Sequence, residues 1–290
     1  MTSERRALGE DFAPAATGLS ASRLVRWSAW EMALAIALAA AAYATRYLPR
    51  PTGSSAANWW FISSLVLNAA FACVPLALLV FRHRKPMLST LIPAGRVAQD
   101  FGWGLSLGLI VAALNALSVQ RAVAMWLKHI DTGHPDYYHL IFNIGNVPSG
   151  ADHVDFMRPL ALFAASWGAF SPIAEEIFFR GFLYAALRRQ MRAPLAVVLS
   201  AMAFALIHPF GEPMIGALIL GIVVATVYEY SGSLLAPIMT HMALNLSFVL
   251  AMANRGELAQ AVPPWVFIAA AAVFTLHFFV SSRYLFRRAR

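Results

Sequence analysis

Long apolar runs alternate with short polar segments along this 290-residue chain. A helix needs about 20 apolar residues to cross the hydrocarbon of a bilayer, and most of the runs approach that length. We therefore expect an all-α membrane protein with about eight transmembrane helices. The expected helices span about 28–45, 59–81, 101–120, 159–187, 194–209, 213–229, 234–252 and 263–282.

The composition supports the same fold class. Hydrophobic residues make up 60% of the chain and charged residues 12%, and the mean hydropathy is +0.63. A soluble domain carries about twice this charged fraction, and a globular core of this size could not enclose so much apolar surface. The bilayer is therefore the expected surrounding of most of the chain. The single Cys73 excludes an internal disulfide.

The net charge of +8 comes from basic residues that lie mostly between the apolar runs. Membrane topology explains this placement, and no nucleic-acid-binding motif accompanies it, so we expect no nucleic-acid partner. Of the 22 Lys and Arg residues, Arg180 lies within a run and six fall in outer segments if the N-terminus is inside: Arg46, Arg50, Arg121, Lys128, Arg158 and Arg255. The remaining Lys and Arg residues would then lie in cytoplasmic segments. Because basic residues are enriched on the cytoplasmic side, this bias predicts a multi-pass protein of the inner (plasma) membrane with both termini in the cytoplasm.

Three segments follow from this pattern. Residues 1–22 are polar and small and are expected to form a disordered cytoplasmic tail. Residues 23–158 hold the first three helices and an outer loop at about 121–158, and residues 159–290 hold the other five helices. The loop carries His and Asp residues but no His pair at the helical spacing of a zinc site, so a polar cap is favoured.

The first apolar run has a second interpretation. Ala42-Tyr43-Ala44 resembles the cleavage site of a secretory signal peptide. The leader before the run would be about 26 residues long, which exceeds the usual charged region of a signal peptide. A retained helix is therefore favoured over a cleaved one.

The segment SPIAEEIFFRG places ionisable side chains inside the fourth run. A charged group at that depth costs at least about 2.5 kcal/mol and marks a functional site by default. Glu176 and Arg180 are four residues apart, which allows an ion pair on one helix face. A single such pair at a helix end would be structural. The second carboxylate, Glu175, is left to face a cavity, where it is suited to act as a general base for water.

Two further clusters hold polar residues at membrane depth. His208 follows Phe204 by four residues in the fifth run, and His241 precedes Asn245 by four in the seventh. A lone helix-end His is more often structural, and such polar couples also bridge membrane helices. Pro237 is expected to break the seventh helix one turn before His241. At about 1.5 Å per residue the clusters reach one layer, which predicts a polar cavity among the fourth, fifth and seventh helices.

At these residues the chain resembles the CPBP family of CAAX proteases and bacteriocin-processing enzymes, also called the Abi family. Its three motifs are EExxxR, FxxxH and HxxxN. In this chain they are Glu175-Glu176-Ile-Phe-Phe-Arg180, Phe204-Ala-Leu-Ile-His208 and His241-Met-Ala-Leu-Asn245. Each motif is weak alone, but their order and spacing in a polytopic chain make the set specific. The resemblance covers about 160–250.

The resemblance implies an intramembrane endopeptidase. By analogy, Glu175 activates a water molecule with the help of His208. His241 and Asn245 would hold the substrate carbonyl or its oxyanion. The supporting residues would be Glu176, Arg180 and Phe204. Because the active groups lie within the bilayer, the implied substrate is a membrane-anchored protein or peptide, such as a leader, a C-terminal sorting helix or a CAAX-like tail.

The mechanism and the function keep alternatives at this stage. A glutamic-type mechanism without a cofactor is favoured, since the chain has no HExxH helix and Asn is a poor zinc ligand. The alternative is a zinc ion held by Glu175, His208 and His241. Two other functions stay open: a non-enzymatic immunity or assembly factor, and a proton-coupled transporter with a buried Glu–His relay. No internal repeat typical of transporters is visible.

Overall fold

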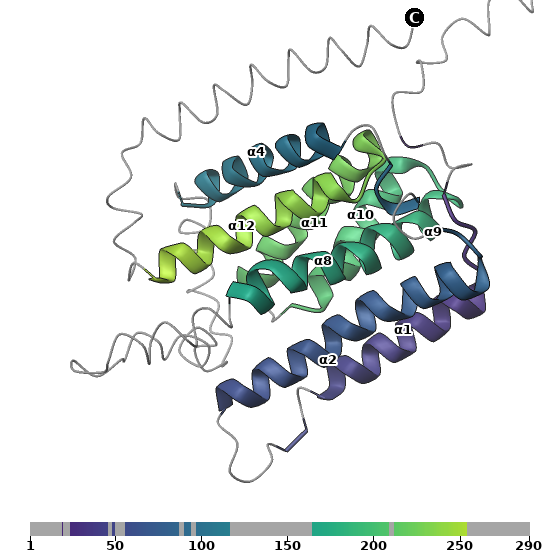
Figure 1. Cartoon of the computed structure of the whole chain (residues 1–290), viewed down its shortest axis with the longest axis horizontal. Helices are drawn as coiled ribbons and strands as arrows, with labels where there is room; N and C mark the ends of the chain where they lie inside the picture. Colours follow the sequence, from purple (N-terminus) through teal and green to yellow (C-terminus); the bar gives the residue numbers. More distant parts are fainter. Residues whose placement is uncertain are drawn as a thin grey trace, which may run out of the picture.

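The computed structural model is helical throughout the residues that it describes, which confirms the all-α fold class (Figure 1). The described residues are 19, 24–45, 48–49, 56–86, 90–93, 97–116, 164–208 and 212–253. The α-helices are α1 (Ala29–Ala44), α2 (Ala56–Ala77), α4 (Val97–Ala116), α8 (Ser171–Glu176), α9 (Ala185–Arg188), α10 (Ala193–Leu206), α11 (Glu212–Ser231) and α12 (Leu235–Ala253). Three π-helical segments, η3 (Leu78–Arg82), η5 (Ala164–Phe170) and η6 (Ile177–Tyr184), adjoin them.

The helices coincide with the first seven runs expected from the sequence. The eighth expected helix at 263–282, the loop at 121–158 and nearly all of the tail at 1–22 lie outside the described residues. Two described helices are long and apolar enough to cross a membrane, Ile62–Arg82 and Pro213–Ser231. Shorter apolar helices cover Ala29–Ala44, Val97–Ala112 and Ala193–Leu206. The count of eight spans therefore stays a prediction.

The fourth expected helix is not uniform. It is described from Ala164 to Arg188 and changes from π-helix (η5) to α-helix (α8), then to π-helix (η6) and back to α-helix (α9). Pro172 is the second residue of α8 and lacks the N–H that would continue the ladder of backbone hydrogen bonds. Single π-helical turns often occur at functional sites, and here they flank the two adjacent carboxylates.

The expected break at Pro237 is wrong. Helix α12 begins at Leu235, so Pro237 lies in its first turn rather than one turn inside it. The N–H groups of a first turn have no partner within the helix, so a proline costs nothing there. His241 therefore stands on regular α-helix.

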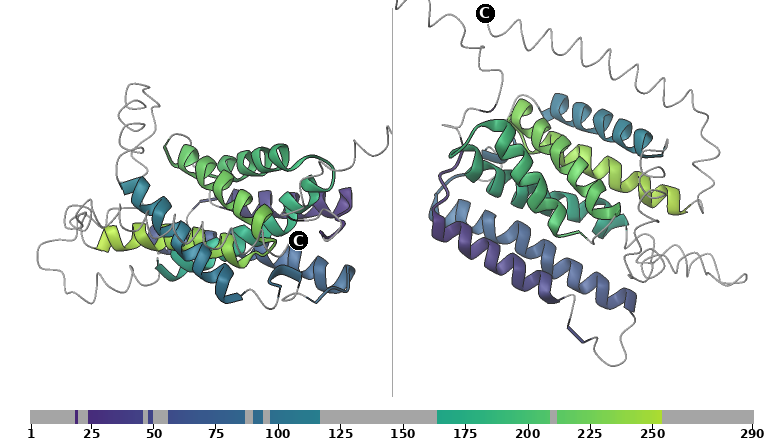
Figure 2. Two further views of the ribbon diagram at one scale, coloured as in Figure 1. Left: turned by 90° about the horizontal axis from the view of Figure 1, so that it is seen from above. Right: turned by 180° about the vertical axis from the view of Figure 1, so that it is seen from behind.

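The helices are arranged as a series in which α8 and η6 are central (Figures 1 and 2). Helices α1 and α2 form a pair, and α2 packs against α8 and η6. On the other side of α8 lies α12, and α4 packs against α12. Helices α10 and α11 pack on each other and on η6. This arrangement brings the three polar clusters of the sequence, on α8–η6, α10 and α12, to the middle of the molecule.

Two kinds of contact fix these helices. An aromatic cluster joins α2, η6 and α10: the Phe71 and Phe178 ring centroids are 4.8 Å apart, and those of Phe179 and Phe204 are 5.1 Å apart. Between α4 and α12 the backbones approach closely, since a Cβ at Gly108 would lie 2.5 Å from the Thr240 carbonyl oxygen. Glycine is therefore required where α4 passes the turn that carries His241.

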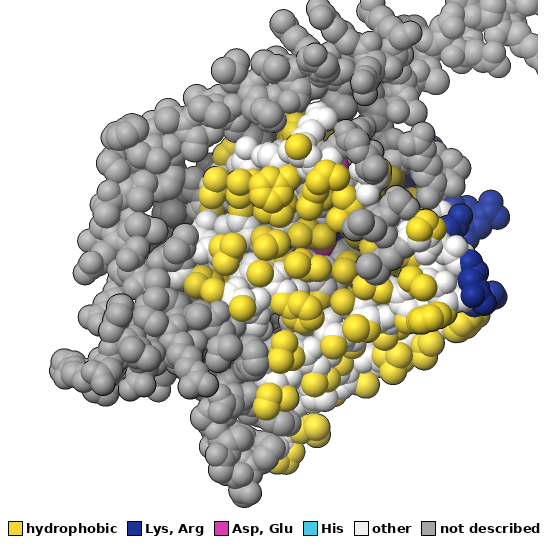
Figure 3. All heavy atoms as spheres, in the orientation of Figure 1, with side chains coloured by type: hydrophobic (Ala, Val, Ile, Leu, Met, Phe, Trp, Pro, Cys, Tyr) yellow, Lys and Arg dark blue, Asp and Glu magenta, His cyan; other side chains and the backbone are white. Residues whose placement is uncertain are grey.

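The surface of the described helices suits a lipid environment. Hydrophobic side chains cover the face shown in Figure 3, and Lys and Arg gather at one end. Large side chains such as Trp30, Ile36, Val66 and Ile219 are among the exposed ones. In a soluble monomer so broad an apolar face would be unusual, whereas lipid chains would cover it in a bilayer.

Candidate active site

Glu176 and Arg180 form a fully buried ion pair within the α8–η6 segment. The Arg180 Nη1 atom lies 2.9 Å from Glu176 Oε1, and both side chains are 0% exposed. Arg180 Nη2 also donates a hydrogen bond to the Gly221 carbonyl oxygen at 3.1 Å, and the guanidinium lies 4.7 Å from the centroid of the Phe204 ring. The pairing expected from the i, i+4 spacing is therefore present.

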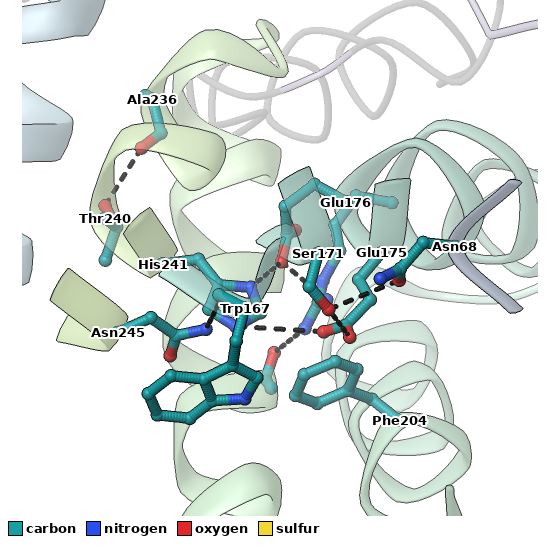
Figure 4. Close-up of polar contacts among 12 residues, drawn as sticks. Asn68, Trp167, Ser171, Glu175, Glu176, Phe204, Ala236, Thr240, His241 and Asn245 are labelled. Atoms are coloured by element: carbon teal, nitrogen blue, oxygen red, sulfur yellow. Dashed lines mark hydrogen bonds and ion pairs between the residues drawn. The ribbon is translucent and has the colours of Figure 1, made fainter. Parts of the chain in front are cut away.

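His241 is held by the same carboxylate (Figure 4). Its Nδ1 atom lies 2.9 Å from Glu176 Oε1, so one oxygen serves both the guanidinium and the imidazole. Glu176 Oε1 is a hydrogen-bond acceptor, so the proton of a neutral His241 belongs on Nδ1, where it is donated to the carboxylate. The Nε2 atom of His241 is then a hydrogen-bond acceptor.

Glu175 lies on the other side of His241. Its Oε2 atom is 3.8 Å from His241 Nε2, and its Oε1 atom accepts a 2.5 Å hydrogen bond from the Ser171 hydroxyl. Ser171 Oγ is in turn 3.2 Å from the side-chain amide of Asn68 on α2. The two adjacent carboxylates thus have different surroundings: Glu176 is neutralised by a cation, whereas Glu175 faces a hydroxyl and an imidazole.

His208 lies just beyond the end of α10 and adjoins the cluster through Phe204. Its Nδ1 atom is 2.9 Å from the Phe204 carbonyl oxygen, and its ring centroid is 4.8 Å from that of Phe204. The Phe204 ring also contacts the His241 ring, and their centroids are 5.7 Å apart. The structure therefore places His241 next to Glu175, and His208 across an aromatic ring from His241.

Asn245 lies one turn beyond His241 on α12, as the spacing of four predicted. One N–H of its amide donates a 2.9 Å hydrogen bond to the Trp167 carbonyl oxygen in η5. This bond ties α12 to the π-helical turn before α8 and fixes the plane of the amide. The second N–H of the amide is the donor that remains for a substrate.

Two residues of the site escaped the sequence analysis, Asn68 and Ser171. Asn68 is an amide in the middle of the second apolar run, and Ser171 opens the segment that contains Glu175. Uncharged polar side chains are tolerated in membrane helices, so they give a weaker signal than a carboxylate does. Their position in long apolar runs was the available clue.

The zinc alternative requires three ligand side chains grouped around one point. Among the described residues, no three or more His, Cys, Asp and Glu side chains are grouped so that they could hold a metal ion. Two atoms bound to one tetrahedral zinc ion at about 2.1 Å would lie about 3.4 Å apart, against 3.8 Å for the Glu175–His241 pair. The set Glu175, His208 and His241 is therefore not assembled as a zinc site in this structure.

The comparisons with known proteins agree with the motifs. Residues 157–247 match the family model described as type II CAAX prenyl endopeptidase, Rce1-like. This segment is similar to an Rce1-like domain. The domain confirms the resemblance to the CPBP family, and its family is one of membrane-embedded CAAX-type proteases. No curated protein and no solved structure matches the chain.

The Rce1-like domain contains all seven residues that the sequence analysis singled out, because they fall between 175 and 245. Helices α1, α2 and α4 precede the matched segment. Asn68 therefore contacts Ser171 of the matched segment from a helix that the family model does not cover.

Proposed function

We propose that the protein is an intramembrane endopeptidase in which Glu175 activates a water molecule that hydrolyses a peptide bond. The observation that carries this proposal is the facing pair of Glu175 Oε2 and His241 Nε2, 3.8 Å apart. Both atoms are acceptors when Glu175 is ionised and His241 carries its proton on Nδ1. Two facing acceptors favour a molecule with two donors between them.

Water has this property. The lines from a water oxygen to the two atoms, each at the usual hydrogen-bond length of about 2.8 Å, would meet at an angle of about 85°. That angle is somewhat smaller than the one between the two O–H bonds of water, so both hydrogen bonds would bend slightly. Both protons then point at Glu175 and His241, which turns the lone pairs of the oxygen away from the protein groups and toward a substrate.

The reaction follows ordinary general acid–base chemistry. Glu175 removes one proton as the water oxygen attacks the carbonyl carbon of the substrate. The carbon–nitrogen bond then breaks, and the proton passes from Glu175 to the leaving amine. Glu176 holds the Nδ1 proton of His241 throughout, in the way that a buried carboxylate fixes the tautomer of a catalytic histidine.

Asn245 and His208 complete the proposed site on the substrate side. The second N–H of the Asn245 amide is suited to the oxyanion, because its other N–H already fixes the amide plane. The Nδ1 atom of His208 lies 2.9 Å from the Phe204 carbonyl oxygen, and this contact orients the imidazole beside the ring of Phe204. The resemblance to the CPBP family implied that His208 assists Glu175, and the contacts above favour His241 for that part.

The proposed substrate is an extended segment next to a membrane anchor. A transmembrane helix bonds its own backbone groups and must unwind before water can attack it. A segment beside a lipid anchor or at the end of a sorting helix avoids most of this cost. The family of the domain acts on CAAX-type substrates, and a prenylated C-terminal tail is one member of this class.

Cleavage by the purified full-length protein tests the proposal. Peptides with and without a C-terminal prenyl anchor, and peptides with an apolar helix, would be incubated with the wild type and with Glu175→Gln in detergent. Mass spectrometry should show cleavage next to an anchor by the wild type and none by Glu175→Gln. Glu229→Gln is the control, since Glu229 pairs with Arg188 away from the site and should stay active. Equal cleavage by wild type and Glu175→Gln would contradict the mechanism.

A cellular measurement covers substrates outside the peptide set. The membrane peptides of a strain carrying Glu175→Gln should contain an uncleaved precursor that the wild-type strain lacks. If both strains have the same membrane peptides and the same phenotype, the non-enzymatic assembly factor would replace the peptidase.

A further inference from the structure

Asn68 on α2 is a buried polar side chain whose neighbour is the active-site segment. It is 3% exposed, and its side-chain amide lies 3.2 Å from Ser171 Oγ. Ser171 Oγ is 2.5 Å from Glu175 Oε1. A continuous chain of polar atoms therefore runs from α2 to the carboxylate that we propose as the base (Figure 4).

The direction of the hydrogen bonds in this chain follows from the number of protons. The Ser171 hydroxyl has one proton and two neighbours that can accept it. The shorter contact is the one to the carboxylate, and a hydrogen bond to an ionised acceptor is the stronger of the two. The atom of Asn68 that faces Ser171 Oγ is Oδ1, and a half-turn of the amide exchanges it for Nδ2, which gives the Ser171 oxygen a donor. Asn68 then donates to Ser171, and Ser171 donates to Glu175.

We propose that Asn68 is a positioning residue of the active site, which acts through Ser171 to hold the Glu175 Oε1 atom and so directs Oε2 toward His241. This inference rests on the proposed function. It extends the active site beyond residues 157–247, the segment that the family model covers, to a helix of the N-terminal half. Asn68 touches neither water nor substrate in this scheme.

The helix packing does not require this contact. Three residues after Asn68, on the same face of α2, Phe71 packs against Phe178 and Phe179 of η6 with ring centroids 4.8 and 5.4 Å apart. That contact joins the helices without a polar group. One turn before Asn68, Ser64 is equally buried (4%), and its Oγ has no hydrogen-bond partner among the described residues. The same face of α2 thus carries two buried polar residues: Asn68, which contacts Glu175 through Ser171, and Ser64, which does not.

A double-mutant cycle tests the proposal. The kcat and KM would be measured for Asn68→Ala, Ser171→Ala and the double variant, on the peptide that the wild type cleaves fastest. Asn68→Ala should lower kcat about tenfold, the effect of one hydrogen bond, and leave KM unchanged. The double variant should be no slower than Ser171→Ala alone, because Asn68 acts through Ser171. Ser171→Thr keeps the hydroxyl and should retain most of the activity.

Ser64→Ala is the matched control, and it should leave kcat within about twofold, since its hydroxyl makes no bond to lose. Asn68→Ser provides a variant that keeps a buried polar group on α2 but is too short to reach Ser171. If Asn68→Ala fails to fold, Asn68→Ser takes its place, and its kcat should be about tenfold below that of the wild type. The proposal is overturned if the effects of Asn68→Ala and Ser171→Ala multiply, or if Asn68→Ala is no slower than Ser64→Ala.

A measurement without substrate separates this proposal from the proposed function. Dicyclohexylcarbodiimide is apolar and modifies carboxyl groups within membranes, and mass spectrometry reports its adduct on Glu175. Loss of the donor uncovers Oε1, so Asn68→Ala and Ser171→Ala should both react faster than the wild type, whereas Ser64→Ala should not. This pattern would uphold the contact even in a protein that cleaves no peptide. Equal rates in all four proteins would refute it.

Discussion

Arg180 neutralises Glu176 inside the protein, and replacing it with Met tests the centre of the polar cluster. The variant leaves a carboxylate that is fully buried, with the His241 imidazole as its remaining partner in the described structure. Removing one member of a buried ion pair costs about 3–5 kcal/mol, because the other charge stays desolvated. In a chain of this size that loss corresponds to a fall in Tm on the order of 10 °C.

A second substitution separates stability from activity. In the double variant Arg180→Met/Glu176→Leu both charges are gone, and apolar replacement of a buried pair is neutral or stabilising by about 1–4 kcal/mol. The Tm should therefore return to the wild-type value or above it. Activity should not return, because the Nδ1 proton of His241 has lost its acceptor and the tautomer is no longer fixed.

Thermal unfolding in detergent gives the Tm of each variant, and the peptide cleavage assay gives its activity. Arg188→Met is the control, because the Arg188 and Glu229 side chains are 22% and 13% exposed, and pairs near the surface contribute about 0–1 kcal/mol. The reasoning is refuted if Arg180→Met melts within a few degrees of Arg188→Met. It is also refuted if the double variant is less stable than Arg180→Met.

Four further predictions concern the oxyanion donor, the helix packing, the cofactor and the topology. Asn245→Ala should lower kcat about a hundred- to a thousandfold, as the loss of one oxyanion donor does; a loss below tenfold would remove it from that role. Gly108→Ala should lower Tm, because its Cβ would lie 2.5 Å from the Thr240 carbonyl oxygen, whereas Gly102→Ala meets nothing within 4 Å and should not. Activity should survive prolonged treatment with a chelator, and loss with recovery on adding zinc would restore the metal alternative. Reporters fused at residue 140 and at the C-terminus should report opposite sides of the membrane, and signals from the same side would refute the predicted topology.

The sequence was sufficient for the fold class and for most of the candidate site. Apolar runs about as long as a bilayer is thick predicted the positions of the described helices, since in lipid a backbone has few alternatives to a helix. Charged residues in those runs identified Glu175, Glu176 and Arg180, because burying a charge is costly enough to be rare without a function. The i, i+4 spacing also predicted the Glu176–Arg180 pair, which depends on one helix alone.

The partners across helices were decided only by the tertiary structure. Sequence spacing placed the polar clusters in one layer, but it contains no information on which side chains of α2, α8 and α12 face one another. It therefore could not show that His241 rather than His208 adjoins Glu175. The sequence analysis also missed Asn68, because the role of an amide in an apolar run depends on the side chain that packs against it, here Ser171. The π-helical turns on either side of α8 change the direction of every side chain after them, and nothing in the apolar pattern of the chain indicates them. Local periodicity thus determines which residues are costly to bury, and packing determines which of them meet.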